Sequence, residues 1–165
     1  DVKPHVVGEI VVQSKSLMMG YWRKPDETRN AMIDGWLHTG DMGYYDEKGF
    51  MYIVDRKKEM IITGGENVYP REIEEVLYRH PAVSEAAVIG IPDAKWVERV
   101  HAVVTLKEGQ GVGSDEIIAF CREHLARYKA PRSVEFVECL PKNPQGKIMK
   151  RQIREKYWQE CERKI

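Results

Sequence analysis

The amino-acid sequence predicts an α+β fold with two parts, a short β-rich region and a compact domain in which helices pack on a small sheet. Its 165 residues, of which 42% are hydrophobic, suit one domain or one small domain with part of another. Strand signals are few up to about residue 55, whereas strand and helix patterns alternate further along the chain. We place the boundary near residues 56–58, which gives the parts 1–57 and 58–165.

The first part contains two strand signals. Residues 8–13 are rich in Val and Ile, and residues 50–54 form a second apolar run that is entered through a turn at residues 46–49. Residues 20–25 and 35–38 combine Gly or Pro with aromatic residues, which predicts turns and short strands. These elements are too few to close a core alone.

The second part begins with a predicted strand at residues 59–62, a glycine turn at residues 63–67 and a helix that starts at Pro70. Apolar residues at i, i+3, i+4 and i+7 give this helix one inner face: Ile73, Val76, Leu77 and the ring of His80. Residues 83–91 and 100–106 are rich in Val, Ile and Ala, so we expect a strand in each.

A second helix is predicted from Ser114, whose hydroxyl suits an N-cap and is followed by acidic residues. Its inner face is expected to carry Ile118, Cys121 and Leu125. Residues 133–136 alternate as a last strand, and residues 149–161 predict a charged terminal helix. This order of elements predicts helices on one or both faces of the sheet.

The composition excludes several functions. Lys and Arg together number 26, as do Asp and Glu, so no net charge attracts nucleic acid or an anionic membrane. Cys121, Cys139 and Cys161 lack the paired spacing of a metal site, and they indicate a reducing compartment. No apolar run approaches the roughly 20 residues of a membrane span, and residues 1–5 carry no signal-peptide pattern. We therefore expect a soluble cytoplasmic protein without a metal site.

Lys147 is the strongest functional candidate from the residues alone. It follows Gly146, which lets the backbone approach a ligand closely, and Pro141 and Pro144 stiffen the same loop. Such a loop could deliver one ammonium group to an anion. A basic surface loop remains the alternative interpretation.

Four motifs in order resemble the late core motifs of the adenylate-forming (ANL) superfamily, which includes acyl-CoA synthetases, adenylation domains of peptide synthetases and luciferases. They lie at residues 20–25, 35–41, 55–70 and 141–151. The resemblance covers nearly the whole chain. It implies that residues 1–57 are the β-rich end of a large N-terminal adenylation domain, and that residues 58–165 are the mobile C-terminal domain.

The resemblance also implies roles for residues near the boundary. Asp41 corresponds to the ribose-binding carboxylate and Arg56 to a second ribose contact, while Lys58 occupies the hinge position. Without the motifs, the three residues would be interpreted as an aspartate in a turn, a surface arginine at a strand end and a solvated lysine.

Lys147 corresponds to the catalytic lysine of adenylation, in which a carboxylate attacks the α-phosphate of ATP. Gly64 and Gly65 correspond to the loop that lines the pantetheine tunnel during thioester formation, with a simple turn as the alternative. Several other basic residues are interpreted as a solvated face that could also meet phosphates of coenzyme A: Lys142, Lys150, Arg151, Arg154 and Lys156.

The wording of residues 64–70 favours the acyl-CoA synthetase branch, with ATP, Mg²⁺ and coenzyme A as its cofactors and cosubstrates. Two local departures are present. Val97 stands where family members often have glycine, and Gln13-Ser14 replaces a basic residue and a glycine. They affect loop conformation and leave the catalytic set intact.

The implied partners are the missing N-terminal domain and a small-molecule acid, so we expect this part to be inactive alone. A second copy could also pair through exposed strand edges, giving a homodimer. Two other functions stay open: an adenylation domain that loads a carrier-protein thiol, and a non-catalytic α+β interaction module.

Overall fold

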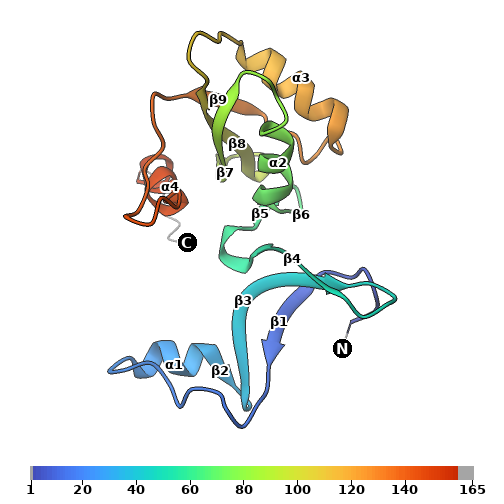
Figure 1. Cartoon of the computed structure of the whole chain (residues 1–165), viewed down its shortest axis with the longest axis vertical. Coiled ribbons are helices and arrows are strands. Elements are labelled where there is room, and N and C mark those ends of the chain that lie inside the picture. The colour runs from blue at the N-terminus through green and yellow to red at the C-terminus, as the bar shows by residue number, and fades with distance from the viewer. Residues whose placement is uncertain (1, 160–165) are drawn as a thin grey trace. The chain divides into compact units, whose positions relative to one another are not determined.

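The computed structural model describes residues 2–159, and the chain divides into two compact units, Asp1–Lys58 and Glu59–Ile165 (Figure 1). Each unit carries its own sheet. Within the described residues no helix is long and apolar enough to span a membrane. The mixed α/β architecture confirms the predicted fold class.

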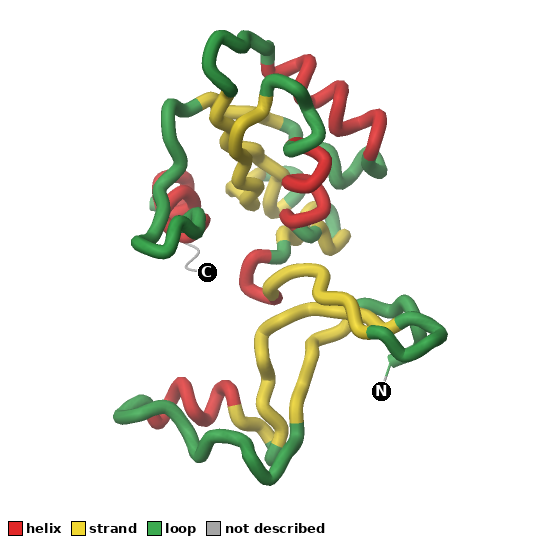
Figure 2. Tube along the Cα trace, in the orientation of Figure 1, coloured by secondary structure: helices red, strands yellow, loops and turns green. Residues whose placement is uncertain are grey.

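The first unit is an antiparallel sheet built around one long strand. β3 (Trp36–Tyr45) pairs with β1 (Gly8–Val12), β2 (Met32–Ile33) and β4 (Met51–Arg56) (Figure 2). Among the described residues of this unit, only Gly43 and Asp55 are buried. The expectation that this region closes no core alone is confirmed.

The length of β3 was not predicted, because its glycines look like strand breakers in the sequence. A Cβ on Gly43 would lie 2.7 Å from the carbonyl oxygen of Tyr52, so the close pairing of β3 with β4 requires glycine there. Glycine inside a strand often marks such a close backbone approach.

The helix α1 (Pro25–Ala31) was also missed. It has no buried residue and therefore no apolar stripe that the sequence could show. Its start follows a local rule, since Pro25 occupies the first turn, where a missing N–H costs nothing.

The second unit has a five-stranded sheet in the order β6-β5-β8-β7, with β9 paired to β8 in parallel. The strands are β5 (Ile61–Thr63), β6 (Glu66–Val68), β7 (Val83–Asp93), β8 (Val97–Leu106) and β9 (Ser133–Phe136). The helices are α2 (Pro70–Leu77), α3 (Ser114–His124) and α4 (Lys150–Trp158), and a short 3-10 helix, η1 (Lys57–Glu59), precedes β5. Figure 1 shows α2 and α3 on one side of the sheet and α4 on the other.

Each side of this sheet has its own core. Ile73 and Leu77 of α2 and Ile117 of α3 are fully buried against one face of β7 and β8. Ile153 of α4 packs with Ile89 and other residues of the opposite face. Helices therefore cover both faces, one of the two arrangements that the sequence left open.

Three details of the helices differ from the prediction. Gly113 is the N-cap of α3, and Ser114 makes no capping hydrogen bond. Ile117 is buried in place of Ile118, because two adjacent isoleucines leave the phase of the apolar stripe ambiguous. α4 ends at Trp158, and Cys161 lies outside the described residues.

A polar cluster fastens α4 to the sheet. Buried His101 of β8 has its Nδ1 2.7 Å from Ser133 Oγ and its Nε2 3.0 Å from the hydroxyl of Tyr157. Tyr157 donates a hydrogen bond to Glu135, and Lys156 donates a second one at 2.6 Å. Burial lowers the pKa of the His101 imidazole below its ordinary value of 6.5, although the charge of Glu135 opposes the shift.

This lowered pKa predicts that the unit loses stability in mild acid. In the unfolded chain the His101 imidazole binds a proton near pH 6.5, whereas in the folded chain it does so only at lower pH. The contribution of neutral His101 to folding stability is therefore present above pH 6.5 and is lost as the pH falls. Hydrogen bonds from Lys156 and Tyr157 hold the pKa of Glu135 below its usual range, so Glu135 stays ionised there. Urea unfolding between pH 5 and pH 8 should show a flatter profile for His101→Asn than for wild type. Parallel profiles would contradict this role.

Val97 has a backbone conformation that suits glycine. Its φ is +71°, a left-handed value that a β-branched side chain adopts only with strain, and its side chain is half exposed. Replacing Val97 with Gly should stabilise the chain by about 1 kcal/mol, because relieved strain exceeds the entropy cost of glycine. Chemical denaturation can measure this, with Ile62→Gly as a control that should destabilise. Ile62 is 46% exposed in β5 and is not among the described residues with positive φ.

Candidate functional site

Asp41 and Arg56 lie opposite each other on β3 and β4. Arg56 Nε is 2.9 Å from Asp41 Oδ1. The side chain of Asp41 is 30% exposed and that of Arg56 is 50% exposed. Asp41 belongs to a regular strand, so its interpretation as a turn residue is wrong. The pair places a carboxylate acceptor beside a guanidinium donor, and both kinds of group can bind sugar hydroxyls, as the two predicted ribose contacts require.

Next to this pair lies a charged cluster that the sequence did not reveal. Glu9 Oε2 is 2.8 Å from Lys57 Nζ and 3.1 Å from His38 Nδ1. The hydrogen bond from Lys57, followed by that from His38, lowers the pKa of the Glu9 carboxyl. Glu9 precedes Lys57 by 48 positions, a separation at which sequence patterns carry no contact information.

Lys58 lies in η1, which links β4 to β5, and its side chain is exposed. A single 3-10 turn fixes few backbone hydrogen bonds, so the predicted hinge role is compatible with this position. The role itself stays a prediction.

Gly64 and Gly65 form the two-residue turn between β5 and β6. Both have positive φ values, +60° and +86°, as a tight hairpin turn of this type requires. The space around them differs. A Cβ on Gly64 would lie 2.6 Å from the ring of Trp96, whereas a Cβ on Gly65 would meet nothing within 4 Å. Gly65 therefore borders open space, as the tunnel prediction needs.

Lys147 lies at the end of a tight loop organised by Asn143. The Oδ1 of Asn143 accepts hydrogen bonds from the backbone N–H groups of Gln145 and Lys147, at 3.1 and 2.8 Å. The backbone N–H of Asn143 returns a bond of 2.9 Å to the Lys147 carbonyl, and Gly146 turns the chain with a φ of +79°. The side chain of Lys147 is exposed and has no acidic partner among residues 2–159. A rigid loop thus presents an ammonium group that is available to an anion.

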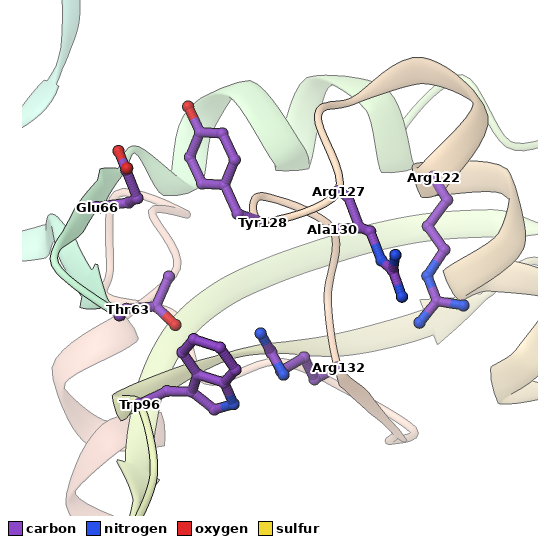
Figure 3. Close-up of a pocket in the computed structure, with 9 residues that line it drawn as sticks. Thr63, Glu66, Trp96, Arg122, Arg127, Tyr128, Ala130 and Arg132 are labelled. Atoms are coloured by element: carbon purple, nitrogen blue, oxygen red, sulfur yellow. The ribbon is translucent and has the colours of Figure 1, made fainter.

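A pocket of about 480 Å³ opens beside the Gly64 turn (Figure 3). Its lining combines one indole, one phenol and three guanidinium groups with a buried threonine: Thr63, Gly64, Glu66, Trp96, Arg122, Arg127, Tyr128, Ala130 and Arg132. Arg132 stacks over Trp96, with its Cζ 4.4 Å from the ring centroid. The buried Thr63 Oγ1 makes no hydrogen bond within the described part of the chain.

Two hydrogen-bond sets hold this pocket in shape. Asp93 accepts the backbone N–H groups of Lys95 and Trp96 at 2.9 and 3.0 Å, and these bonds lower the pKa of its carboxyl. Lys129 donates to both oxygens of Glu72, at 2.8 and 2.7 Å, which fixes the segment between Arg127 and Arg132. The pocket is therefore preorganised around groups that bind aromatic rings and phosphates.

From the sequence alone we interpret Lys142, Lys150, Arg151, Arg154 and Lys156 as a solvated face that could also meet phosphates of coenzyme A. Those residues do not line the pocket. The sequence does carry one signal for this pocket, the basic residues Arg127, Lys129 and Arg132 beside an aromatic residue. No local pattern connects these residues with Trp96.

Three comparisons relate the chain to known proteins. Residues 72–147 match the AMP-binding enzyme C-terminal domain. The chain is 52% identical over 152 residues to a long-chain-fatty-acid–CoA ligase of Bacillus subtilis, and this match covers 92% of the chain and 27% of the ligase. It is 44% identical over 165 residues to the fatty acid–[acyl-carrier-protein] ligase ScoC of Streptomyces coeruleorubidus, and this match covers 100% of the chain and 32% of ScoC.

The fold is also found in solved structures. The crystal structure of ATP-bound MatB from Rhodopseudomonas palustris superposes with a TM-score of 0.87 at 39% identity, covering 94% of the chain and 31% of that protein. The chain thus spans between 27% and 32% of the length of the two curated relatives named above. The resemblance to the adenylate-forming superfamily seen in the motifs is confirmed: residues 72–147 match the AMP-binding enzyme C-terminal domain, and the two ligases and MatB are similar to nearly the whole chain.

Proposed function

We propose that the chain is the C-terminal part of an ATP-dependent acyl-CoA synthetase, which joins a carboxylic acid to coenzyme A. A fatty acid is the proposed class of acid. The pocket between Trp96 and the three arginines carries this proposal. Coenzyme A ends in an adenine and in phosphate groups, for which an indole and guanidinium groups are suitable partners. The volume of about 480 Å³ also lies in the range of small-molecule sites.

The pocket continues into the turn that the proposal assigns to the pantetheine arm. Gly64 lines the pocket, and Gly65 beside it borders open space. A narrow chain could cross this turn without a side chain in its path. The unpartnered hydroxyl of Thr63 supplies a donor or an acceptor for the same ligand.

The proposed activity consists of two half-reactions. In the first, an oxygen of the substrate carboxylate attacks the α-phosphorus of ATP and pyrophosphate leaves. Lys147 stabilises the negative charge that develops, while Asp41 and Arg56 hold the ribose. In the second, the thiol of coenzyme A attacks the acyl carbon and AMP leaves. Lys58 would be the hinge between the two steps.

Mg²⁺ fits this chemistry as the partner of ATP, whose phosphate charge it neutralises. Within residues 2–159 no group of three or more His, Cys, Asp or Glu could hold a metal ion. The rest of the site belongs to an N-terminal domain, and this chain alone is expected to be inactive. We further infer a cytoplasmic location, where ATP, coenzyme A and reduced thiols occur together.

A carrier-protein thiol is the second candidate acceptor, because ScoC is named as an acyl-carrier-protein ligase. The pocket distinguishes the two acceptors, since a carrier's phosphopantetheine lacks the adenosine end of coenzyme A. An interaction module without catalysis would bind neither acceptor. A homodimer would be seen independently as a doubled mass in solution.

Arg132→Gln in the full-length enzyme tests the acceptor. It should raise the KM for coenzyme A about tenfold, because a hydrogen bond to a charged group contributes about 1.5–3 kcal/mol. The KM for phosphopantetheine should stay unchanged. Steady-state thioester assays with both acceptors measure this, with Arg79→Gln, an exposed arginine outside the pocket, as the control. Equal effects on both acceptors would contradict a nucleotide-binding pocket.

A further inference from the structure

Lys150 is a basic residue of α4 that is not part of a solvated face. It is the first residue of the helix, and its side chain is only 15% exposed. The neighbouring Arg151 has a side chain that is 91% exposed. A lysine with so little exposure needs a specific partner, and Lys150 has at least two among the described residues.

Both partners are carboxylates from distant parts of the sequence. Lys150 Nζ lies 2.7 Å from Glu74 Oε1 on α2 and 3.3 Å from Glu59 Oε2 in η1. Glu74 is 14% exposed and also accepts the backbone N–H of Val88 at 2.7 Å. Glu74 is therefore fixed to the sheet, and Lys150 is held to a rigid point of the core.

Glu59 brings the start of the unit to the same point. It is the last residue of η1 and follows Lys58 directly. Its side chain is 26% exposed, so its pairing with Lys150 is less screened by water than a surface ion pair. The segment after the proposed hinge is thus tied to Lys150.

Lys150 also ends the loop that carries Lys147, three positions earlier. The other end of this loop is fastened by Lys142, whose Nζ lies 2.6 Å from Glu85 Oε1 on β7. The backbone N–H of Met149 closes the loop with a bond of 2.8 Å to the carbonyl of Pro141. Both ends of the loop are therefore held by carboxylates of other elements, Glu85 on β7 and Glu74 on α2.

We propose that Lys150 is a positioning residue, which joins the Lys147 loop and the segment after Lys58 into one rigid body through Glu59 and Glu74. The proposal rests on the proposed function for the role of Lys147. A lysine that must reach a phosphate through a hinge motion needs a stiff connection between hinge and loop. Without Lys150, rotation at the hinge would place Lys147 less accurately.

Hydrogen exchange on this chain tests the connection without any enzyme assay. Lys150→Met should increase exchange at least about fivefold in both residues 57–62 and residues 141–149, because both lose the same anchor. The matched control Arg151→Met should change neither segment. Faster exchange in residues 141–149 alone would overturn the proposal, since Lys150 would then hold only its own loop.

Glu59→Gln is the second variant, for the case that Lys150→Met unfolds the chain by removing the ammonium group from the mostly buried carboxylate of Glu74. It removes one carboxylate charge while Lys150 keeps Glu74. Exchange should rise by about twofold or more in residues 141–149, although the substitution is far from them in sequence. Unchanged exchange in that loop would refute the connection.

Half-reaction kinetics in the full-length enzyme test the catalytic consequence. Lys150→Met should lower kcat of adenylation about tenfold with little change in the KM for ATP, and Lys150→Arg should restore most of it. In a Lys147→Ala background the further loss should vanish, because a misplaced ammonium no longer matters. An equal loss in both backgrounds would assign Lys150 a merely structural role. If the full-length enzyme forms no acyl-adenylate at all, the proposed function fails, whereas the exchange results still decide the connection.

Discussion

Lys147→Ala in the full-length enzyme is expected to slow adenylation by about 10²- to 10³-fold, the usual loss when one preorganised donor to a developing charge is removed. The loop that carries Lys147 is held by Asn143 and presents the ammonium group without an acidic partner among the described residues. The substitution removes this charge and leaves the loop hydrogen bonds in place, because Lys147 takes part in them through its backbone N–H and carbonyl. ATP–pyrophosphate exchange measures the first half-reaction directly.

The second half-reaction provides the internal control for Lys147→Ala. When acyl-adenylate is supplied, thioester formation should stay within about threefold of wild type, since the thiol then attacks the acyl carbon and no bond to the α-phosphorus is made or broken. Lys147→Arg should retain part of the adenylation rate because it keeps a cation. Arg151→Ala, at a residue with a 91% exposed side chain, should change neither step. Equal losses in both half-reactions of Lys147→Ala would contradict the assignment.

Gly65→Leu is expected to slow thioester formation and to spare adenylation, the reverse of the pattern expected for Lys147→Ala. A side chain there would occupy the open space beside the turn, and we expect it to lower the rate of thioester formation by about 10²-fold or more, since it blocks the path of the thiol. Adenylation should be largely retained. The measurement is single-turnover transfer from supplied acyl-adenylate to coenzyme A.

Backbone strain needs its own control, because φ of Gly65 is +86° and any side chain is strained there. Gly109 has a φ of +72° and, like Gly65, nothing within 4 Å of an added Cβ. Gly109→Leu should therefore destabilise the unit to a similar degree and leave both half-reactions intact. If Gly109→Leu also abolishes thioester formation, loss of stability explains the result and the tunnel prediction fails.

Local patterns predicted the second unit well because each of its main elements buries one face. The spacing of Ile73, Val76 and Leu77 fixed the inner side of α2, and all three are buried. The first unit buries little, so its sequence carries weaker signals. β3 contains Gly40 and Gly43, and α1 has no apolar stripe, which explains why both were missed.

The candidate site was predicted only where a single motif contains the residue. Asp41, Arg56 and Lys147 were identified in this way, whereas the pairing of Asp41 with Arg56 depends on strand register. The pocket joins Thr63, Trp96 and Arg132, which lie far apart in the sequence and meet only after the sheet has formed. The same reason applies to Lys150, whose partners Glu59 and Glu74 precede it by more than 70 residues.

We propose that one small domain serves two chemical steps with two different turns, the Lys147 loop and the Gly64–Gly65 hairpin. The most direct test is the ratio of the adenylation rate to the thioester-formation rate, measured on wild type, Lys147→Ala and Gly65→Leu of the full-length enzyme under the same conditions. We expect this ratio to fall in Lys147→Ala and to rise in Gly65→Leu, each by about 10²-fold. A ratio that stays at the wild-type value in both variants would contradict the account.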